Sequence, residues 1–338
     1  MPLTFAPALV NGPFGDPGLL VDFLLEKRAL LCDLGDVSAL TPRQLLRISD
    51  IFVSHTHMDH FCGFDHWLRV CLGREAGARL FGPPGFVEQV GHKLAAYTWN
   101  LVQNYPTDFI LEAWAVHPDW HAEGVRYRCH ARFKPEALPP RTLADGVLVD
   151  EPHFRVRAAF LEHRTPCLGF AIEAKPRLHV NKERLTALGV PSGPWLAEMK
   201  RVIQSGAPDD TPITIAWHDR EGMRERMHAL DDLRNELVSE ERGEKIAYVT
   251  DVRYTEDNAR RITELALNAD QLFIECVFLD VDAHHAAAKC HLTARQAGAL
   301  AHRAHTRAVV PFHFSPRYVG REHLLRAELV AAHVGRGG

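Results

Sequence analysis

The chain has 338 residues, enough for one large domain or two of ordinary size. Hydrophobic residues make up 46% and charged residues 24%, proportions typical of a globular protein with a sizeable core. The net charge of −4 argues against a protein that binds nucleic acid over its whole surface, although a local basic patch can still contact phosphates. No apolar run approaches the roughly 20 residues that a membrane span requires.

The N-terminus and the cysteines favour a cytoplasmic location. Met1 to Pro7 contain no basic stretch followed by an apolar core, so we expect no signal peptide. The seven cysteines are an odd number, and no two of them form a Cys-x-x-Cys pair. Several lie in apolar segments, which indicates buried reduced thiols rather than a disulfide framework.

The first half of the chain alternates strand-like and helix-like segments. Short apolar runs predict strands at 19–23, 29–32, 50–53 and 79–81, of which the first two form a pair with a turn near residues 26–27. Apolar residues at helical spacing predict helices over 59–72 and 86–99. Further runs of strand character occur at 109–116, 125–131, 147–149, 154–162 and 167–173. Three prolines between Lys134 and Thr142 predict a loop.

The pattern changes after Lys175. A short helix over 182–188 and a rigid turn over 189–194 precede a strand at 213–217. The clearest helix is predicted over 221–241, where five apolar residues recur at spacings of three and four: Met223, Met227, Leu230, Leu233 and Leu237. Such a stripe is typical of a helix packed on a core, and a subunit contact is the alternative.

The last third of the chain alternates apolar runs with helices. The apolar runs lie at 246–250, 271–274 and 308–312, and the helices at 259–267, 293–304 and 321–334. No stretch has the composition of a flexible linker. We therefore expect a single domain, residues 1–338, with an inserted or modified arm or lid segment at about 176–242.

One six-residue segment, His-Thr-His-Met-Asp-His from His55 to His60, directly follows the apolar strand at 51–53. Alternate side chains of a strand share a face, so His55 and His57 can project together. A helix that begins near Asp59 would bring Asp59 and His60 back over the same point. Imidazole nitrogens and carboxylate oxygens suit zinc and similar divalent ions. This hexapeptide predicts half of a two-metal site, even in a chain with 21 histidines.

Three further candidate ligands stand where predicted strands end, namely His163, Asp251 and His313. Functional side chains are common at such positions, because loops present them on a rigid sheet. Taken singly, each is more often a surface residue or a satisfied core residue. Together with the hexapeptide they make five histidines and two aspartates, which suit two four- or five-coordinate metals that share one carboxylate and a water.

Residues 54–63 resemble the signature of the metallo-β-lactamase superfamily. Within it, the chain is similar to ribonuclease Z, the endonuclease that trims the 3′ end of precursor tRNA, and the likeness runs from about residue 29 to 320. The later motifs that carry this resemblance are His163 to Phe170, Gly189 to Pro194, Thr250 to Arg253, His291 to Thr293 and His313 to Tyr318. The segment from Gly189 resembles a part of, or a stretch after, the arm with which the family grips tRNA.

The resemblance implies an α/β fold, the metallo-β-lactamase-like αββα sandwich of two mixed β-sheets flanked by helices. It implies two metal ions, with zinc favoured by the nitrogen-rich ligands and manganese or iron as alternatives. It also implies a homodimer. The ligands would be His55, His57 and His163 for one ion, Asp59, His60 and His313 for the other, and Asp251 between them.

The resemblance and general chemistry together assign roles in catalysis. Asp59 would orient a water shared by the two ions and accept its proton. His291 is the candidate proton donor to the leaving 3′ oxygen, kept cationic by Glu275, with a residue that merely begins a helix as the alternative. Arg317 and Arg253 are candidate phosphate contacts, with solvated surface charge as the alternative.

Asp33 follows the strand at 29–32, where members of the superfamily often place an acidic residue beside the ligands. A carboxylate there would fix the tautomer of a ligand histidine. An aspartate in a turn before Gly35 is an equal alternative.

The chain departs from the family pattern at four points. Ile274 stands where the family has the histidine of its His-Glu motif, and Thr250 stands where it has a glycine. The N-terminal Gly-Thr-Gly turn and a compact Gly/Lys-rich arm are absent. These departures leave the expected metal ligands unchanged, but they affect the expected docking of a folded tRNA. A hydrolase of the same fold that acts on a small phosphodiester, ester or lactone is therefore the alternative, and retention of every ligand argues against a non-catalytic protein.

Overall fold

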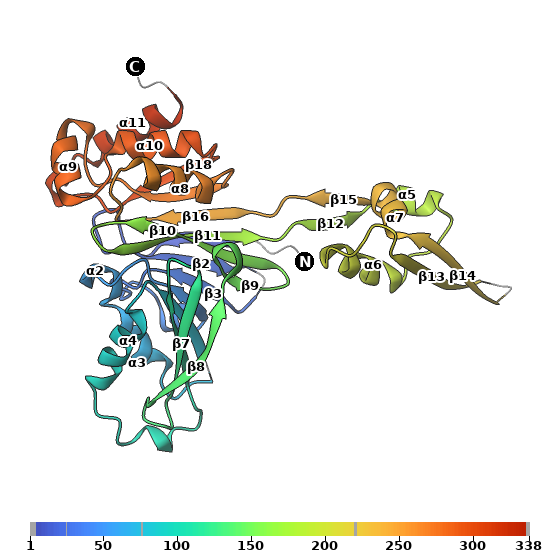
Figure 1. The fold of residues 1–338 in the computed structure, drawn as a ribbon, viewed down its shortest axis with the longest axis horizontal. Coiled ribbons are helices and arrows are strands. Elements are labelled where there is room, and N and C mark those ends of the chain that lie inside the picture. The colour runs from blue at the N-terminus through green and yellow to red at the C-terminus, as the bar shows by residue number, and fades with distance from the viewer. Residues whose placement is uncertain (1–4, 25, 76, 220–221, 336–338) are drawn as a thin grey trace. The chain divides into compact units, whose positions relative to one another are not determined.

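The computed structural model describes residues 5–24, 26–75, 77–219 and 222–335, and it divides the chain into two units. Unit 1 comprises Met1–Ala174 and Glu244–Gly338, and unit 2 comprises Lys175–Gly243. Figure 1 shows both units and labels their elements. The first four residues, part of the segment considered for a signal peptide, lie outside the described residues. None of the described helices is both long enough and apolar enough to cross a membrane.

The first sheet of unit 1 has eight strands in the order β1-β2-β3-β4-β5-β6-β7-β8. The predicted pairing of 19–23 with 29–32 is confirmed, and the four strands from β3 to β6 run parallel. The strands are β1 Phe5–Leu9, β2 Leu19–Phe23, β3 Ala29–Cys32, β4 Ile48–Phe52, β5 Gly77–Gly82, β6 Ile110–Val116, β7 His121–Arg128 and β8 Pro135–Thr142.

The loop predicted over 134–142 is wrong, because this stretch forms β8. β8 lies at the edge of the sheet and pairs only with β7. An edge strand tolerates proline, since an N–H on its open side needs no partner in the ladder. The prolines therefore indicated an edge rather than the end of the sheet.

The second sheet has six strands in the order β18-β17-β16-β11-β10-β9. β16, β17 and β18 run parallel, so their carboxyl ends share one edge. Aromatic side chains from both sheets fill the space between them, as where the ring of Phe52 lies 5.4 Å from Phe81 and 5.6 Å from Phe170. The strands are β9 Val147–Asp150, β10 Phe154–Glu162, β11 Pro166–Ala174, β16 Lys245–Val249, β17 Gln271–Glu275 and β18 Ala308–Phe312.

Helices cover the outer face of each sheet, which completes the αββα sandwich (Figure 1). The short α1 connects β3 to β4. The helices against the first sheet are α1 Pro42–Leu45, α2 Met58–Phe61, α3 Phe64–Cys71 and α4 Phe86–Ala95. Those against the second sheet are α8 Glu256–Ala266, α9 Ala283–Lys289, α10 Ala294–Arg303 and α11 Glu322–His333.

The single helix predicted over 59–72 is two helices, α2 and α3, which are separated at Gly63. The N–H of Gly63 donates to the carbonyl oxygen of Leu34, 2.9 Å away, instead of continuing the helix. A Cβ atom at Gly63 would lie 2.0 Å from the carbonyl oxygen of Gly35, so only glycine allows this approach. The hydrogen bond at this break therefore holds the hexapeptide turn against the loop that follows β3.

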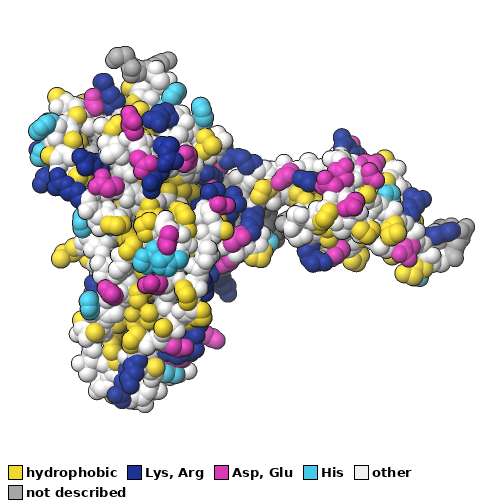
Figure 2. Space-filling view, viewed as in Figure 1, with side chains coloured by type: hydrophobic (Ala, Val, Ile, Leu, Met, Phe, Trp, Pro, Cys, Tyr) yellow, Lys and Arg dark blue, Asp and Glu magenta, His cyan; other side chains and the backbone are white. Residues whose placement is uncertain are grey.

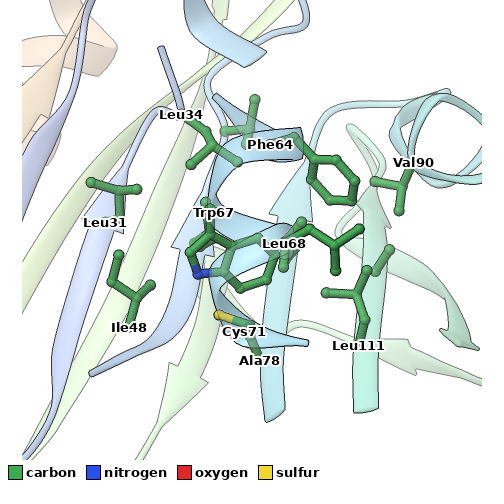
Figure 3. Packing of buried hydrophobic residues seen from close by; sticks show 14 of the residues in the cluster. Leu31, Leu34, Ile48, Phe64, Trp67, Leu68, Cys71, Ala78, Val90 and Leu111 are labelled. Atoms are coloured by element: carbon green, nitrogen blue, oxygen red, sulfur yellow. The ribbon is translucent and has the colours of Figure 1, made fainter. Parts of the chain in front are cut away.

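Helix α3 is anchored by its apolar face. Figure 3 shows Trp67 and Leu68 among side chains of the first sheet, including Leu31 of β3 and Ile48 of β4. The side chain of Trp67 is fully buried. Burial of such large apolar groups contributes about 1.5–3 kcal/mol each, which holds the preceding turn in place.

Unit 2 is inserted between β11 and β16, two neighbouring strands of the second sheet. It has its own small apolar core, to which Trp195, Met199 and Leu233 contribute. Its elements are β12 Arg177–Val180, α5 Lys182–Ala187, α6 Trp195–Gln204, β13 Pro212–Asp219, β14 Gly222–Ala229, α7 Leu230–Leu237 and β15 Val238–Glu241. β12 pairs with β15, and β13 pairs with β14.

The helix predicted over 221–241 is wrong in its first and last parts. Residues 222–229 form the strand β14, only 230–237 are helical, and 238–241 form β15; Glu221 lies outside the described residues. Met223 and Met227 are largely exposed, whereas Leu230, Leu233 and Leu237 are buried. Residue-by-residue pairing of β14 with β13 overrides the local helical spacing.

Candidate metal centre

The hexapeptide folds as a turn between β4 and α2 that brings its histidines together. His57 precedes the first residue of α2 in extended conformation, and Asp59 and His60 lie inside the helix. His55 Nε2 lies 2.8 Å from His57 Nδ1, and the rings of His55 and His60 are 4.2 Å apart between centroids. Asp59 Oδ2 lies 3.5 Å from His60 Nε2. The strand-to-helix turn thus gathers four potential ligands.

The three candidates at strand ends converge on the same place. His163 directly follows β10, Asp251 is the second residue after β16, and His313 directly follows β18. Asp251 Oδ2 lies 3.4 Å from His163 Nε2, 3.5 Å from His60 Nε2 and 3.7 Å from His55 Nε2. The other oxygen, Oδ1, lies 2.8 Å from His313 Nδ1. The carboxylate of Asp251 therefore faces ligands of both groups.

These seven side chains form two groups. Within each group, the potential ligand atoms all lie within 4.8 Å of one another. One group is His55, His57, His163 and Asp251, and the other is Asp59, His60 and His313. We call them together the metal centre. Sequence reasoning selected all seven, and the structure brings all seven together.

The spacing of these atoms fits divalent cations. Bonds of about 2.0–2.1 Å in a tetrahedral site place neighbouring ligand atoms about 3.3–3.4 Å apart, close to the distances around Asp251 Oδ2. His60 Nε2 is buried and has no hydrogen-bond partner among the described residues. A buried ring nitrogen without a partner is unfavourable unless a cation or a water contacts it. The chemistry of the donor set and this orphaned nitrogen are both consistent with a pair of metal ions.

Asp33 contacts His60 and orients its ring. Its Oδ2 accepts hydrogen bonds from His60 Nδ1 and Tyr248 Oη, both at 2.9 Å, and its Oδ1 accepts one from Ser54 N at 2.6 Å. A carboxylate only accepts, so Nδ1 of His60 carries a hydrogen and Nε2 is the nitrogen available to a cation at the centre. Sequence reasoning missed Tyr248 and Ser54, although a tyrosine in a buried strand signals a hidden hydroxyl partner.

The ring of His163 is also oriented by a hydrogen bond of its Nδ1 with a residue distant in the sequence. Its Nδ1 donates to the carbonyl oxygen of Cys290, 2.8 Å away, which leaves the lone pair of Nε2 for the centre.

Three residues of the site have backbone conformations that non-glycine residues rarely adopt. The φ angles are 58° at Asp33, 43° at Asp251 and 59° at His313. Each residue lies just after a strand, where a left-handed residue turns the chain sharply out of the sheet. Such strain costs of order 1–3 kcal/mol per residue and is typical of functional sites.

The electrostatics of the protein groups at the centre follow from burial and from Asp251. Burial lowers the pKa of His55 to about 3, so this imidazole is neutral at pH 7. Burial also opposes the charged form of His60, but the carboxylates of Asp251 and Asp33 outweigh burial and raise the pKa of His60 to about 10. Burial would raise the pKa of Asp59, yet hydrogen bonding to His313 brings it to about 2. A cation would take the place of the His60 proton.

Glu275 and His291 form a pair beside the metal centre. Glu275 is fully buried at the end of β17, and its Oε2 accepts a hydrogen bond of 2.7 Å from His291 Nδ1. Its Oε1 accepts from two backbone N–H groups, those of Val252 and Leu292. Burial opposes the charge of His291, but Glu275 outweighs it and raises the pKa. The ring of His291 lies 5.0 Å from that of His163.

The two candidate phosphate contacts have partners outside the metal centre. Arg253 Nη1 lies 3.9 Å from Glu162 Oε2, with half of its side chain exposed. Arg317 Nη1 lies 3.3 Å from Asp282 Oδ1, and its guanidinium lies over the ring of Phe278. Neither arrangement requires a substrate phosphate.

Two mixed sheets between helices, with five histidines and two aspartates gathered at strand ends and at the start of α2, define a metal-dependent hydrolase of the metallo-β-lactamase fold. No family model matches the chain. It is 33% identical over 318 residues to a ribonuclease Z of Deinococcus radiodurans, covering 92% of this chain and 90% of that one. It is 29% identical over 290 residues to a ribonuclease Z of Microcystis aeruginosa, covering 82% and 74%. The chain belongs to the ribonuclease Z family.

Solved structures share the fold. The short form of human tRNase Z superimposes with a TM-score of 0.50 and 17% identity over 94% of each chain. A metallo-β-lactamase fold protein of Bacillus subtilis has a TM-score of 0.53 and 14% identity over 96% of this chain and 91% of that one.

Proposed function

We propose that this chain is an endoribonuclease that uses two metal ions to cleave precursor tRNA at its 3′ end. Membership of the ribonuclease Z family supports this function. The observation that carries the proposal is the position of Asp251, whose carboxylate lies within 3.4–3.7 Å of three histidine Nε2 atoms and reaches both groups of ligands. Such a shared carboxylate is typical of two-metal phosphodiesterases.

The proposed ligands are those of the metal centre, with Asp251 between the ions. When bound, two such ions allow water to act as a nucleophile near neutral pH and offset negative charge on the phosphoryl oxygens. Zinc is proposed because nitrogen dominates the donor set, and manganese and iron are the alternatives.

Asp59 has the position of a base. Its Oδ2 lies 3.5 Å from both His60 Nε2 and His313 Nε2, and 42% of its side chain is exposed, so it can reach a water at the centre. Its lowered pKa keeps it ionised at neutral pH. We assign to Asp59 the orientation of that water and the acceptance of its proton.

His291 has the position of an acid. Glu275 holds its Nδ1–H, which leaves Nε2 as the nitrogen that can donate a proton to the leaving 3′ oxygen. Glu275 itself is anchored by two backbone N–H groups, so it acts as a positioning residue.

We assign contact with the body of the RNA to unit 2. Its β13–β14 hairpin places the guanidinium of Arg226 over Trp217, and Met223 and Met227 of the same hairpin are exposed. Basic and aromatic groups together suit RNA. Figure 2 shows basic and acidic side chains interspersed on the visible face, so the contact would be local rather than a single positive field.

The proposal includes a cytoplasmic homodimer. All seven cysteines are free, as expected in a reducing compartment, and the dimer follows from the family resemblance. Light scattering of the purified protein tests the dimer directly.

One observation favours the alternative, a hydrolase of a small phosphodiester. Ile274 is fully buried in β17 within an apolar cluster, at the position where the family has a histidine, so this chain lacks one polar group next to Glu275 in the sequence. The experiment below separates the two functions.

Metal-loaded protein should be incubated with a precursor tRNA that carries a 3′ trailer and with bis(p-nitrophenyl) phosphate. We expect cleavage at the trailer junction. Asp251→Ala should lose at least one ion by elemental analysis and should lose both activities, whereas Asp257→Ala, an exposed aspartate of α8, should retain them. Turnover of the small ester without tRNA cleavage at any salt concentration would reject the RNA function. Full retention of two ions by Asp251→Ala would remove it from the ligand set.

A further inference from the structure

The hairpin between β6 and β7 carries a second group of potential metal ligands, outside the metal centre. His117 follows β6 and His121 begins β7, and the N–H of His117 donates to the carbonyl oxygen of His121 at 2.9 Å. Their rings are stacked, with centroids 4.1 Å apart and planes inclined by 7°, so the ring of His117 has to turn about its Cβ–Cγ bond before both Nε2 lone pairs can meet at one ion. Glu123 lies two residues after His121 and so shares its face of the strand. We call His117, His121 and Glu123 the hairpin cluster.

The polar atoms of the hairpin cluster are spaced for coordination rather than for hydrogen bonding. Glu123 Oε2 lies 3.6 Å from His117 Nε2, and Oε1 lies 3.7 Å from His121 Nε2. These separations exceed a hydrogen bond but approach the distance between neighbouring ligands of a four-coordinate zinc. One ligand atom from each residue lies within 4.8 Å of the others. His117 Nε2 is buried and has no hydrogen-bond partner among the residues that the structure describes.

Asp119 fixes the tautomer of His121 that a metal ligand requires. Its Oδ1 accepts a hydrogen bond of 2.5 Å from His121 Nδ1, so the ring hydrogen is on Nδ1 and Nε2 has a free lone pair. A carboxylate in this position is the usual outer partner of a metal-bound histidine. Asp33 and His60 show the same arrangement in the metal centre.

The turn that presents the hairpin cluster is held rigidly. Trp120 has a φ of 61°, and its N–H donates to the carbonyl oxygen of His117. Its own carbonyl oxygen accepts from Leu143 N at 2.7 Å, and its ring packs 5.3 Å from that of Phe160. A ligand set on a braced turn loses little conformational entropy when an ion binds.

We propose that the β6–β7 hairpin is a second site for a divalent transition metal, with His117, His121 and Glu123 as protein ligands. Two nitrogens and one oxygen favour Zn²⁺ over Mg²⁺ or Ca²⁺. Three protein ligands leave at least one position for water or an exchangeable ligand. The site shares no residue with the metal centre and lies at the same edge of the first sheet, since β4, β5 and β6 run parallel and β5 separates the two turns.

The full chain should be dialysed to equilibrium against Zn²⁺ and its zinc content measured by elemental analysis. The double variant His117→Ala/His121→Ala should hold one zinc fewer than the unaltered protein. His153→Ala, which removes an exposed histidine elsewhere in unit 1, should hold as many as the unaltered protein. Equal zinc content in the double variant and the unaltered protein, at a concentration that saturates the latter, would overturn the proposal.

Two further measurements keep the test valid if the double variant folds poorly. Glu123→Gln changes a side chain that is two-thirds exposed, and it should weaken the additional zinc by at least about tenfold in a chelator competition. Anomalous diffraction at the zinc edge should show a peak between His117 Nε2 and His121 Nε2. Absence of that peak in zinc-saturated crystals would overturn the proposal independently of any variant.

Discussion

Asp33 Oδ2 lies 2.9 Å from His60 Nδ1, and both side chains are completely buried. This contact joins the strand end of β3 to the helix α2. It fixes which nitrogen of His60 carries the hydrogen, and so aims the unpaired Nε2 at the metal centre. The carboxylate also holds Tyr248 and Ser54, which ties both sheets to one ligand.

Replacement of Asp33 by asparagine should weaken metal binding. An amide can donate as well as accept, so it no longer enforces the Nδ1–H tautomer of His60. We expect affinity for the ion at His60 to fall about 10–100-fold, measured by competition with a chelator. Asp36→Asn, an exposed neighbour, is the control. Identical affinities for the two variants would show that Asp33 does not act on the ligand.

His291→Ala should slow phosphodiester turnover by about 10²–10⁴-fold while both ions are retained, because it removes the proposed proton donor but no ligand. His284→Ala, an exposed residue of α9, should have little effect on the rate. Glu275→Gln should slow the reaction through His291, so the double variant should be barely slower than His291→Ala alone. An unchanged rate for His291→Ala would exclude it as the donor.

Glu151 should contribute to stability in a pH-dependent way. Its Oε2 lies 2.5 Å from Arg28 Nη1 and its Oε1 lies 2.9 Å from Arg79 Nη2. The hydrogen bond from Arg28 holds the pKa of Glu151 below its usual 4.5. A carboxyl group whose pKa is lowered by folding stabilises above its unfolded pKa, and this stabilisation is lost as the pH falls through the folded value.

Glu151→Gln should therefore lower the Tm at pH 7, and the difference from the unaltered protein should shrink below about pH 4.5. Calorimetry at a series of pH values measures this. Glu136→Gln, whose nearest arginine nitrogens are 3.8–3.9 Å away, should change the Tm little at any pH. A Tm difference for Glu151→Gln that did not depend on pH would contradict the assignment.

Removal of unit 2 should separate RNA binding from chemistry. Ala174 N donates to the carbonyl oxygen of Glu244 at 2.8 Å, so an Asn-Gly turn in place of residues 176–242 would join two strands that already pair. We expect turnover of bis(p-nitrophenyl) phosphate to persist, with a rise in KM for precursor tRNA of at least about tenfold, equivalent to about 1.4 kcal/mol.

Circular dichroism should confirm that the shortened protein is folded before its rates are compared. An unchanged KM for precursor tRNA would show that unit 2 does not contact the substrate. Loss of small-ester turnover in a folded protein would instead indicate that unit 2 takes part in the chemistry.

The elements that sequence reasoning located are those in which local pattern and tertiary environment agree. The strands before His55 and His313 are short runs rich in apolar residues, and the strand before His163 alternates apolar residues with arginines, so their ends follow from the local pattern. The errors occur where distant pairing decides. β14 is a strand because β13 lies beside it, and β8 accepts prolines because nothing pairs with its outer side.

By itself, the sequence determined which residue types stand at which strand ends, because apolar periodicity and ligand chemistry are local properties of the chain. Only the tertiary structure decided between the two readings of Asp33, since its contact with His60 joins residues that are 27 positions apart. It also decided that His117, His121 and Glu123 face one another, because cross-strand register sets which side chains of a hairpin meet.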